Sequence, residues 1–140
     1  MKYISKHVSY SEAIRSNTAK RKGINNEPNM EQIENMQLLC KMVFEPLRQC
    51  FKQPIRISSM FRGVELNKAV KGSSRSQHCK GEAMDIQGTN GVTNAELYYF
   101  IRDHLEFDQL IWEYGNDTEP SWVHVSFTDS KPNRKQTLKI

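Results

Sequence analysis

Apolar side chains recur at spacings of three and four residues in two stretches of the chain, which is the pattern of a helix with one buried face. The first helix begins near Met30, and its stripe comprises Ile33, Met36, Cys40, Val43 and Leu47. Pro46 is expected to kink or end it, because proline lacks a backbone N–H. The second helix follows a capping box at residues 93–96, and its apolar face comprises Leu97, Phe100, Ile101 and Leu105.

Short segments with alternating or apolar residues predict strands in the rest of the chain. They cover residues 55–59, 83–87, 109–114 and 122–127, and a short helix is expected at 64–70. Helices come first and strands dominate later, which favours an α+β fold with a largely antiparallel sheet.

Strand alternation brings a few polar side chains onto one face of this sheet. Asp85, His124 and Glu113 each face away from the apolar neighbours in their own strands. His78 lies in the loop that leads into the strand of Asp85. Two imidazoles and a carboxylate form a common catalytic zinc set that leaves a fourth position open for water, and Glu113 is the candidate base. The same set also binds non-haem iron, so the spacing alone leaves the metal open. Cys79 is an alternative donor.

Composition bounds the remaining possibilities. The 140 residues predict a single domain over 1–140, with residues 1–29 as an N-terminal arm packed on it. No apolar run is long enough for a membrane span. The net charge of +4 is mild, and the one short basic run, at residues 20–22, has no aromatic stripe beside it, so we expect no nucleic-acid partner. We expect a monomer.

The three cysteines form no C-x-x-C pair and no secretory signal is visible, which favours free thiols. We therefore expect a cytoplasmic location, unless another route carries the protein to the cell envelope.

Three motifs in order resemble the zinc D-Ala-D-Ala carboxypeptidase family, which shares its fold with the hedgehog signalling domain. Residues 76–85, Ser-Gln-His-Cys-Lys-Gly-Glu-Ala-Met-Asp, match its S-x-H-x-x-G-x-A-x-D motif. Residues 122–126 resemble its second metal motif, and residues 58–67 resemble the segment with its substrate-binding arginine. The resemblance covers about residues 9–134 and is strongest to short phage and bacterial members. It implies an antiparallel sheet with helices on one face and a zinc site on the other.

The resemblance also implies roles for individual residues. His78, Asp85 and His124 would hold one Zn²⁺ per chain. Arg62 would bind a substrate carboxylate or carbonyl oxygen and serve catalysis, and Ser76 would support substrate binding by hydrogen bonding.

The position of the expected general base departs from the common family pattern. Many members carry a carboxylate three residues before the last histidine, but this chain has Ser121 there. Residues 107–113 instead resemble the hedgehog-type strand that ends in a glutamate of the site, which again indicates Glu113. Asp117 and Glu119, in the following loop, are its rivals.

These features predict a zinc peptidase that acts on peptidoglycan stem peptides. The resemblance to phage members implies action in the cell envelope after phage-type release. The sequence does not separate a D-Ala-D-Ala carboxypeptidase from an endolysin-type endopeptidase that cuts the L-Ala–D-Glu bond. The alternative is a hedgehog-type binding module that keeps the metal for stability without turnover. A phage structural or nucleic-acid-binding protein has only the mild basic charge in its favour.

Overall fold

A short two-stranded ribbon precedes the first helices in the computed structural model, which describes all 140 residues, and the strands of the main sheet come later. The N-terminal half contains β1 (Tyr3–Ser5), β2 (Val8–Ser9), α1 (Tyr10–Ile14), α2 (Asn17–Lys22), α3 (Met30–Leu39), the π-helical turn η1 (Cys40–Phe44) and α4 (Glu45–Phe51). The remainder contains β3 (Arg56–Ser59), α5 (Val64–Ala69), the 3₁₀ helix η2 (Gln77–Lys80), β4 (Ala83–Gln87), α6 (Asn94–His104), β5 (Gln109–Glu113), β6 (Trp122–Ser126) and β7 (Gln136–Lys139).

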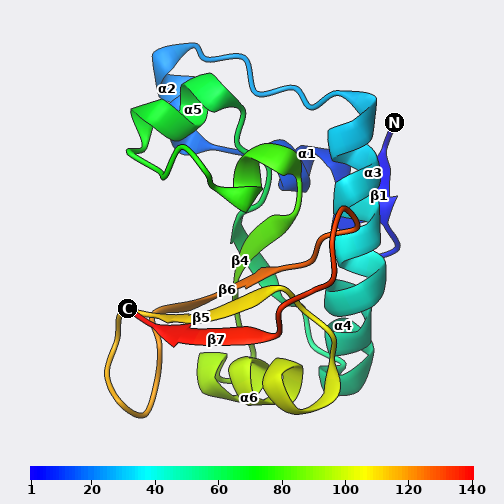
Figure 1. The fold of residues 1–140 in the computed structure, drawn as a ribbon, viewed down its shortest axis with the longest axis vertical. Helices are drawn as coiled ribbons and strands as arrows, with labels where there is room; N and C mark the ends of the chain where they lie inside the picture. The colour runs from blue at the N-terminus through cyan, green and yellow to red at the C-terminus, as the bar shows by residue number, and fades with distance from the viewer.

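The five-stranded sheet has the order β3-β4-β6-β5-β7 (Figure 1). Neighbouring strands are antiparallel except β5 and β7, which are parallel. The α+β fold with a largely antiparallel sheet is therefore confirmed. Strand β7 was not predicted, because all four of its residues are exposed and show no apolar alternation.

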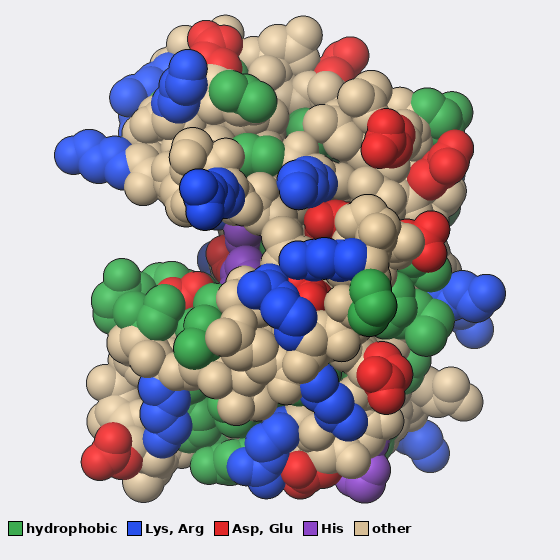
Figure 2. Space-filling model, viewed as in Figure 1, with side chains coloured by type: hydrophobic (Ala, Val, Ile, Leu, Met, Phe, Trp, Pro, Cys, Tyr) green, Lys and Arg blue, Asp and Glu red, His purple; other side chains and the backbone are tan.

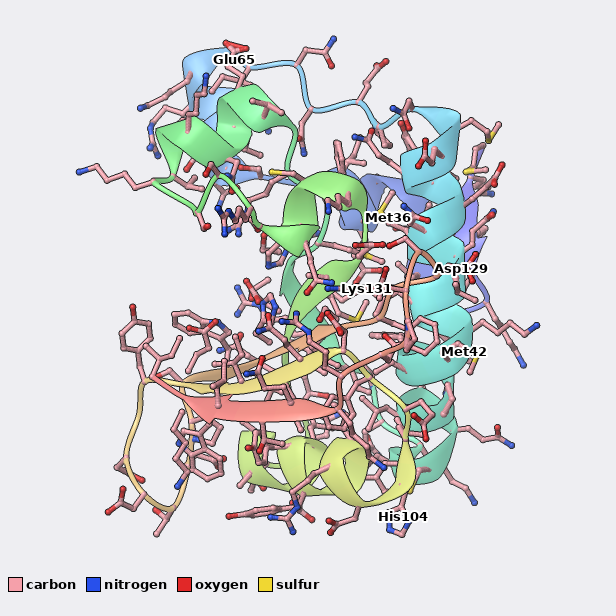
Figure 3. All side chains as sticks on the ribbon, in the orientation of Figure 1. Met36, Met42, Glu65, His104, Asp129 and Lys131 are labelled. Carbon is pink, nitrogen blue, oxygen red and sulfur yellow. The ribbon has the colours of Figure 1, made fainter.

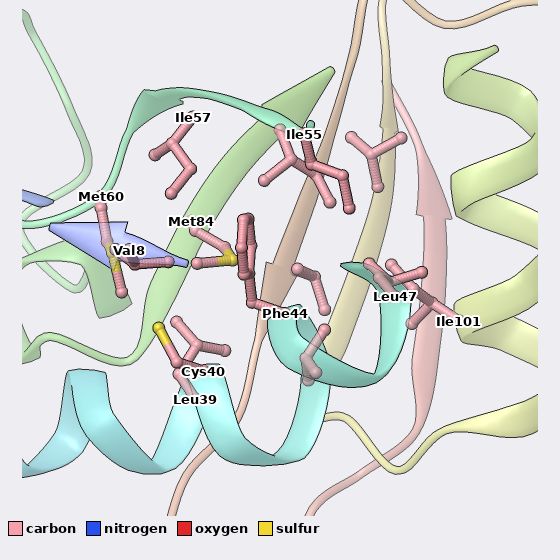
Figure 4. Close-up of a cluster of buried hydrophobic side chains, with 14 of the residues drawn as sticks. Val8, Leu39, Cys40, Phe44, Leu47, Ile55, Ile57, Met60, Met84 and Ile101 are labelled. Atoms are coloured by element: carbon pink, nitrogen blue, oxygen red, sulfur yellow. The ribbon is translucent and has the colours of Figure 1, made fainter. Parts of the chain in front are cut away.

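One face of the sheet packs against the helices and forms the core (Figure 4). Met84 and Ile86 of β4 are fully buried there, together with Phe44 of η1, Leu47 of α4 and Ile101 of α6. The predicted stripe of the first helix is buried as expected, from Ile33 to Leu47. Since this face is filled, the polar side chains of the same strands lie on the opposite face.

Pro46 disturbs the first helix without ending it. It lies at the start of α4, directly after the π-helical turn in which the Glu45 N–H donates to the Cys40 carbonyl. A π turn is one of the few ways in which a helix accommodates a proline that cannot donate. Helical structure consequently continues from Met30 to Phe51.

None of these helices has the length and apolarity that crossing a bilayer requires.

Candidate metal centre

Strand register brings the predicted polar residues together on the face opposite the core. Asp85 of β4 pairs with His124 of β6, and His124 pairs in turn with Ile111 of β5. Trp122, two residues before His124 and therefore on the same face of β6, pairs with Glu113 of β5. Paired residues share a face, so Asp85, His124 and Glu113 lie on one surface, as the alternation predicted.

His78 approaches this surface from η2 rather than from a loop. Ser76 caps the helix by accepting a hydrogen bond from the His78 N–H, and Gly81 ends it in the left-handed conformation at φ 74°. A Cβ on Gly81 would lie 2.4 Å from the Gln32 carbonyl oxygen of α3, so only glycine allows this close approach. The chain thereby folds His78 over the end of β4 and buries its side chain.

The three predicted ligands form a tight cluster. Asp85 Oδ1 lies 3.0 Å from His124 Nδ1 and 3.3 Å from His78 Nε2. His78 Nδ1 lies 2.6 Å from the Met60 carbonyl oxygen and donates a hydrogen bond to it. The other ring nitrogen, Nε2, therefore keeps a free lone pair and faces Asp85. No other group of three His, Cys, Asp or Glu side chains lies as close together, and Cys79 is outside the cluster.

These positions fit a tetrahedral zinc ion. Ligands about 2.0–2.1 Å from such a metal lie roughly 3.3–3.4 Å from one another, close to the two observed distances. The donor set of two imidazoles and one carboxylate is also one that zinc prefers.

The cluster shifts the ionisation of its own members. Burial raises the pKa of Asp85, but the neighbouring His124 and His78 outweigh this effect and hold the pKa well below its usual range. Burial lowers the pKa of His78, and the nearby Asp85 offsets only part of that shift. A carboxylate and a neutral imidazole are the protonation states that bind a metal.

A cleft of about 1060 Å³ lies over the cluster and also contains the other predicted site residues. Arg62, Ser76 and Glu113 line it together with His78, Asp85 and His124. Figure 2 shows histidine side chains deep in this hollow and Lys and Arg side chains along its rim. The tertiary structure thus brings together all six residues that the sequence singled out.

Arg62 is held beside the cluster by its own backbone. Its N–H donates to the His78 carbonyl, and the chain on either side of it is fixed by Asn26. The Asn26 side chain donates to the Phe61 carbonyl and accepts from the Gly63 N–H. Arg62 Nη2 is 3.4 Å from Ser76 Oγ, whereas Nε is buried without a hydrogen-bond partner. The guanidinium group of Arg62 therefore keeps N–H donors without a partner at the cleft.

Glu113 is the acid of the β5–β6 region that reaches the cleft. Burial raises its pKa, while His124 counteracts the shift. The nearby indole N–H of Trp122 also lowers the pKa of Glu113, although it forms no hydrogen bond of regular geometry. The rival Glu119 accepts a hydrogen bond of 2.6 Å from the Ala95 N–H at the start of α6, and Asp117 is exposed in the turn. Neither rival lines the cleft.

The sequence reasoning missed a second polar layer at the cleft. Asp108, just before β5, is fully buried and accepts two side-chain hydrogen bonds from Arg134 and one from Gln77. Glu82, also buried, accepts a hydrogen bond from Thr128. These partners lie 26 and 46 residues apart, so no local pattern marks them.

We expect Asp108→Asn to destabilise the fold by about 1–3 kcal/mol at neutral pH, because charge-assisted hydrogen bonds are lost. Hydrogen bonds from Arg134 hold the pKa of Asp108 at about 2, below the ~4 of an unfolded chain. The extra stability of the wild-type protein over Asp108→Asn is therefore present above pH ~4 and is lost as the pH falls toward 2.

Urea unfolding at pH 7 and at pH 3 measures this effect. Asp103→Asn, which breaks the exposed pair with Arg102, is the matched control and should change little. If wild type and Asp108→Asn differed in unfolding free energy by the same amount at both pH values, the stabilising role of the Asp108 carboxylate would be contradicted.

Comparison with known proteins adds one finding. A family model described as Peptidase M15 matches residues 6–126, which include all six site residues. No match was found among curated proteins.

Proposed function

The chain belongs to the peptidase M15 family, and on that premise we propose that it is a zinc metallopeptidase of peptidoglycan stem peptides. One observation carries the proposal: the cluster of His78, Asp85 and His124 forms the floor of a cleft that also contains a free carboxylate and a guanidinium group. Metal-assisted peptide hydrolysis can use each of these groups: a metal site, a general base and a cation that binds the substrate.

The three clustered side chains would hold the metal through one nitrogen of each histidine and a carboxylate oxygen. Bound zinc would polarise the scissile carbonyl and make water a stronger nucleophile near neutral pH. The hydrogen bond from His78 to the Met60 carbonyl orients its ring for this task.

Glu113 would act as the general base. Its carboxylate accepts the proton of the attacking water and then returns a proton to the leaving amine. Partial burial supports this role, since a raised pKa brings a carboxylate closer to the working pH of a base.

Arg62 would bind a carboxylate or carbonyl oxygen of the substrate. Its backbone is held beside the cluster by the hydrogen bond to His78, and its guanidinium group contacts Ser76, which would support the same subsite. A planar fork of N–H donors matches a carboxylate in two parallel hydrogen bonds.

We expect Arg62→Lys to raise KM about tenfold or more while the melting temperature stays within a degree or two, because lysine keeps the charge but loses the bidentate fork. Steady-state kinetics on a verified stem peptide measure this change. Arg75→Lys, an exposed arginine of the same cleft rim, is the matched control. Unchanged kinetics in Arg62→Lys would reject the role.

Mass analysis of purified muropeptides after incubation with zinc-loaded protein tests the proposed function. Loss of a terminal D-Ala identifies a carboxypeptidase, and cleavage between L-Ala and D-Glu identifies an endopeptidase. Intact muropeptides, together with measurable binding, would instead identify the metal-stabilised binding module.

A further inference from the structure

The far wall of the cleft is built by residues that follow the family-matched part of the chain. The matched part ends at residue 126. Five later residues line the cleft: Thr128, Ser130, Lys131, Arg134 and Ile140. This wall therefore offers contacts that the shared site does not explain.

A closed loop, residues 128–133, forms the first part of this wall. Thr128 Oγ1 donates to the buried Glu82 Oε2 at 2.8 Å and so ties the loop to the start of β4. The Asn133 side chain closes the loop by accepting from the Thr128 N–H and donating to the Thr128 carbonyl. Lys131 lies between these anchors and extends into the space between η2 and the sheet (Figure 3).

The second anchor holds the end of the loop. Arg134 donates to both carboxylate oxygens of the fully buried Asp108, and its N–H donates to the same group. The charge of Arg134 is therefore already paired, whereas its neighbour Lys131 forms no ion pair. Two buried acids thus anchor both ends of the loop that carries Lys131, an exposed lysine without an ion pair, at the cleft.

The charge of the cleft is strongly asymmetric. Six of the chain's 20 Lys and Arg side chains line it, against three of its 16 Asp and Glu side chains. Lys80, the last residue of η2, forms no ion pair either. Unpaired cations that line one cleft raise the local concentration of anionic groups there.

We propose that Lys131 and Lys80 form a second anion subsite, which binds a side-chain carboxylate of the peptide while Arg62 binds nearer the scissile bond. The inference rests on the proposed function and narrows it to substrates with at least two carboxylates. A long polyanion fits less well, because Glu82, Asp85 and Glu113 line the same cleft and would repel it.

Binding measurements test the subsite independently of turnover. Two synthetic stem peptides are compared: one carries a free D-Glu carboxylate and a free C-terminus, and the other has the D-Glu carboxylate converted to a carboxamide. Calorimetry uses the zinc-loaded Glu113→Gln protein, so that neither peptide is consumed. Lys80→Gln and Lys131→Gln are introduced singly and together, and Lys135→Gln is the control because it lies in the same segment but does not line the cleft.

Each single variant should weaken binding of the diacidic peptide about two- to fivefold, and the double variant roughly tenfold. Binding of the amidated peptide should be unchanged, and Lys135→Gln should bind both peptides as the parent does. This pattern supports the subsite even where wild-type protein cleaves neither peptide, a result that would count against the peptidase alone. Equal losses on both peptides, no loss on either, or tighter binding of an oligothymidylate than of the diacidic peptide would overturn it.

Discussion

Replacing His124 with alanine is expected to abolish the proposed zinc binding and, with it, the proposed peptide hydrolysis. His124 supplies one of only three clustered donor atoms and is hydrogen-bonded to Asp85 at 3.0 Å. Loss of a group that merely orients a zinc ligand costs ~10–100-fold in metal affinity. Loss of a ligand itself should therefore exceed about a hundredfold, which leaves the variant metal-free after dialysis.

Elemental analysis of protein purified without chelator gives the comparison. Wild-type protein should contain close to one zinc per chain and the variant almost none, while circular dichroism shows that both are folded. His104→Ala, an exposed histidine at the end of α6, is the matched control and should keep the full metal content. A full equivalent of zinc in His124→Ala would show that the metal lies elsewhere.

Glu113→Gln should retain zinc and the fold but lose at least about a hundredfold in kcat, because general acid–base catalysis is worth ~10²–10⁴-fold. Glutamine keeps the shape of the side chain but cannot accept a proton. The substitution leaves His78, Asp85 and His124 untouched, so any loss of rate is separable from loss of metal.

Glu119→Gln distinguishes Glu113 from its rival. The Glu119 carboxylate accepts from the Ala95 N–H, so its replacement should lower stability slightly and leave kcat near the wild-type value. The reverse outcome, with Glu119→Gln inactive and Glu113→Gln normal, would show that the wrong carboxylate was chosen. Wild-type rates in both variants would require a different way of activating water.

Local patterns in the sequence determined much of the architecture. Alternation has a period of two in any strand, so it placed Asp85, His124 and Glu113 on one face before the register was known. The stripe from Ile33 to Leu47 likewise predicted a buried helix face, and the structure confirms it. The motif resemblance is confirmed by the family match over residues 6–126. The roles of the site residues in zinc binding and catalysis stay predictions.

Tertiary structure decided what depends on distant partners. The sequence places Glu113 on a strand and Glu119 in the loop after it, but only the packing of α6 shows that Glu119 is engaged at the start of that helix. Strand β7 has no apolar pattern of its own and exists through its parallel pairing with β5. The second polar layer joins residues such as Asp108 and Arg134, whose separation removes any periodic signal. Periodicity reports the environment of a single element, whereas these contacts arise only when several elements pack together.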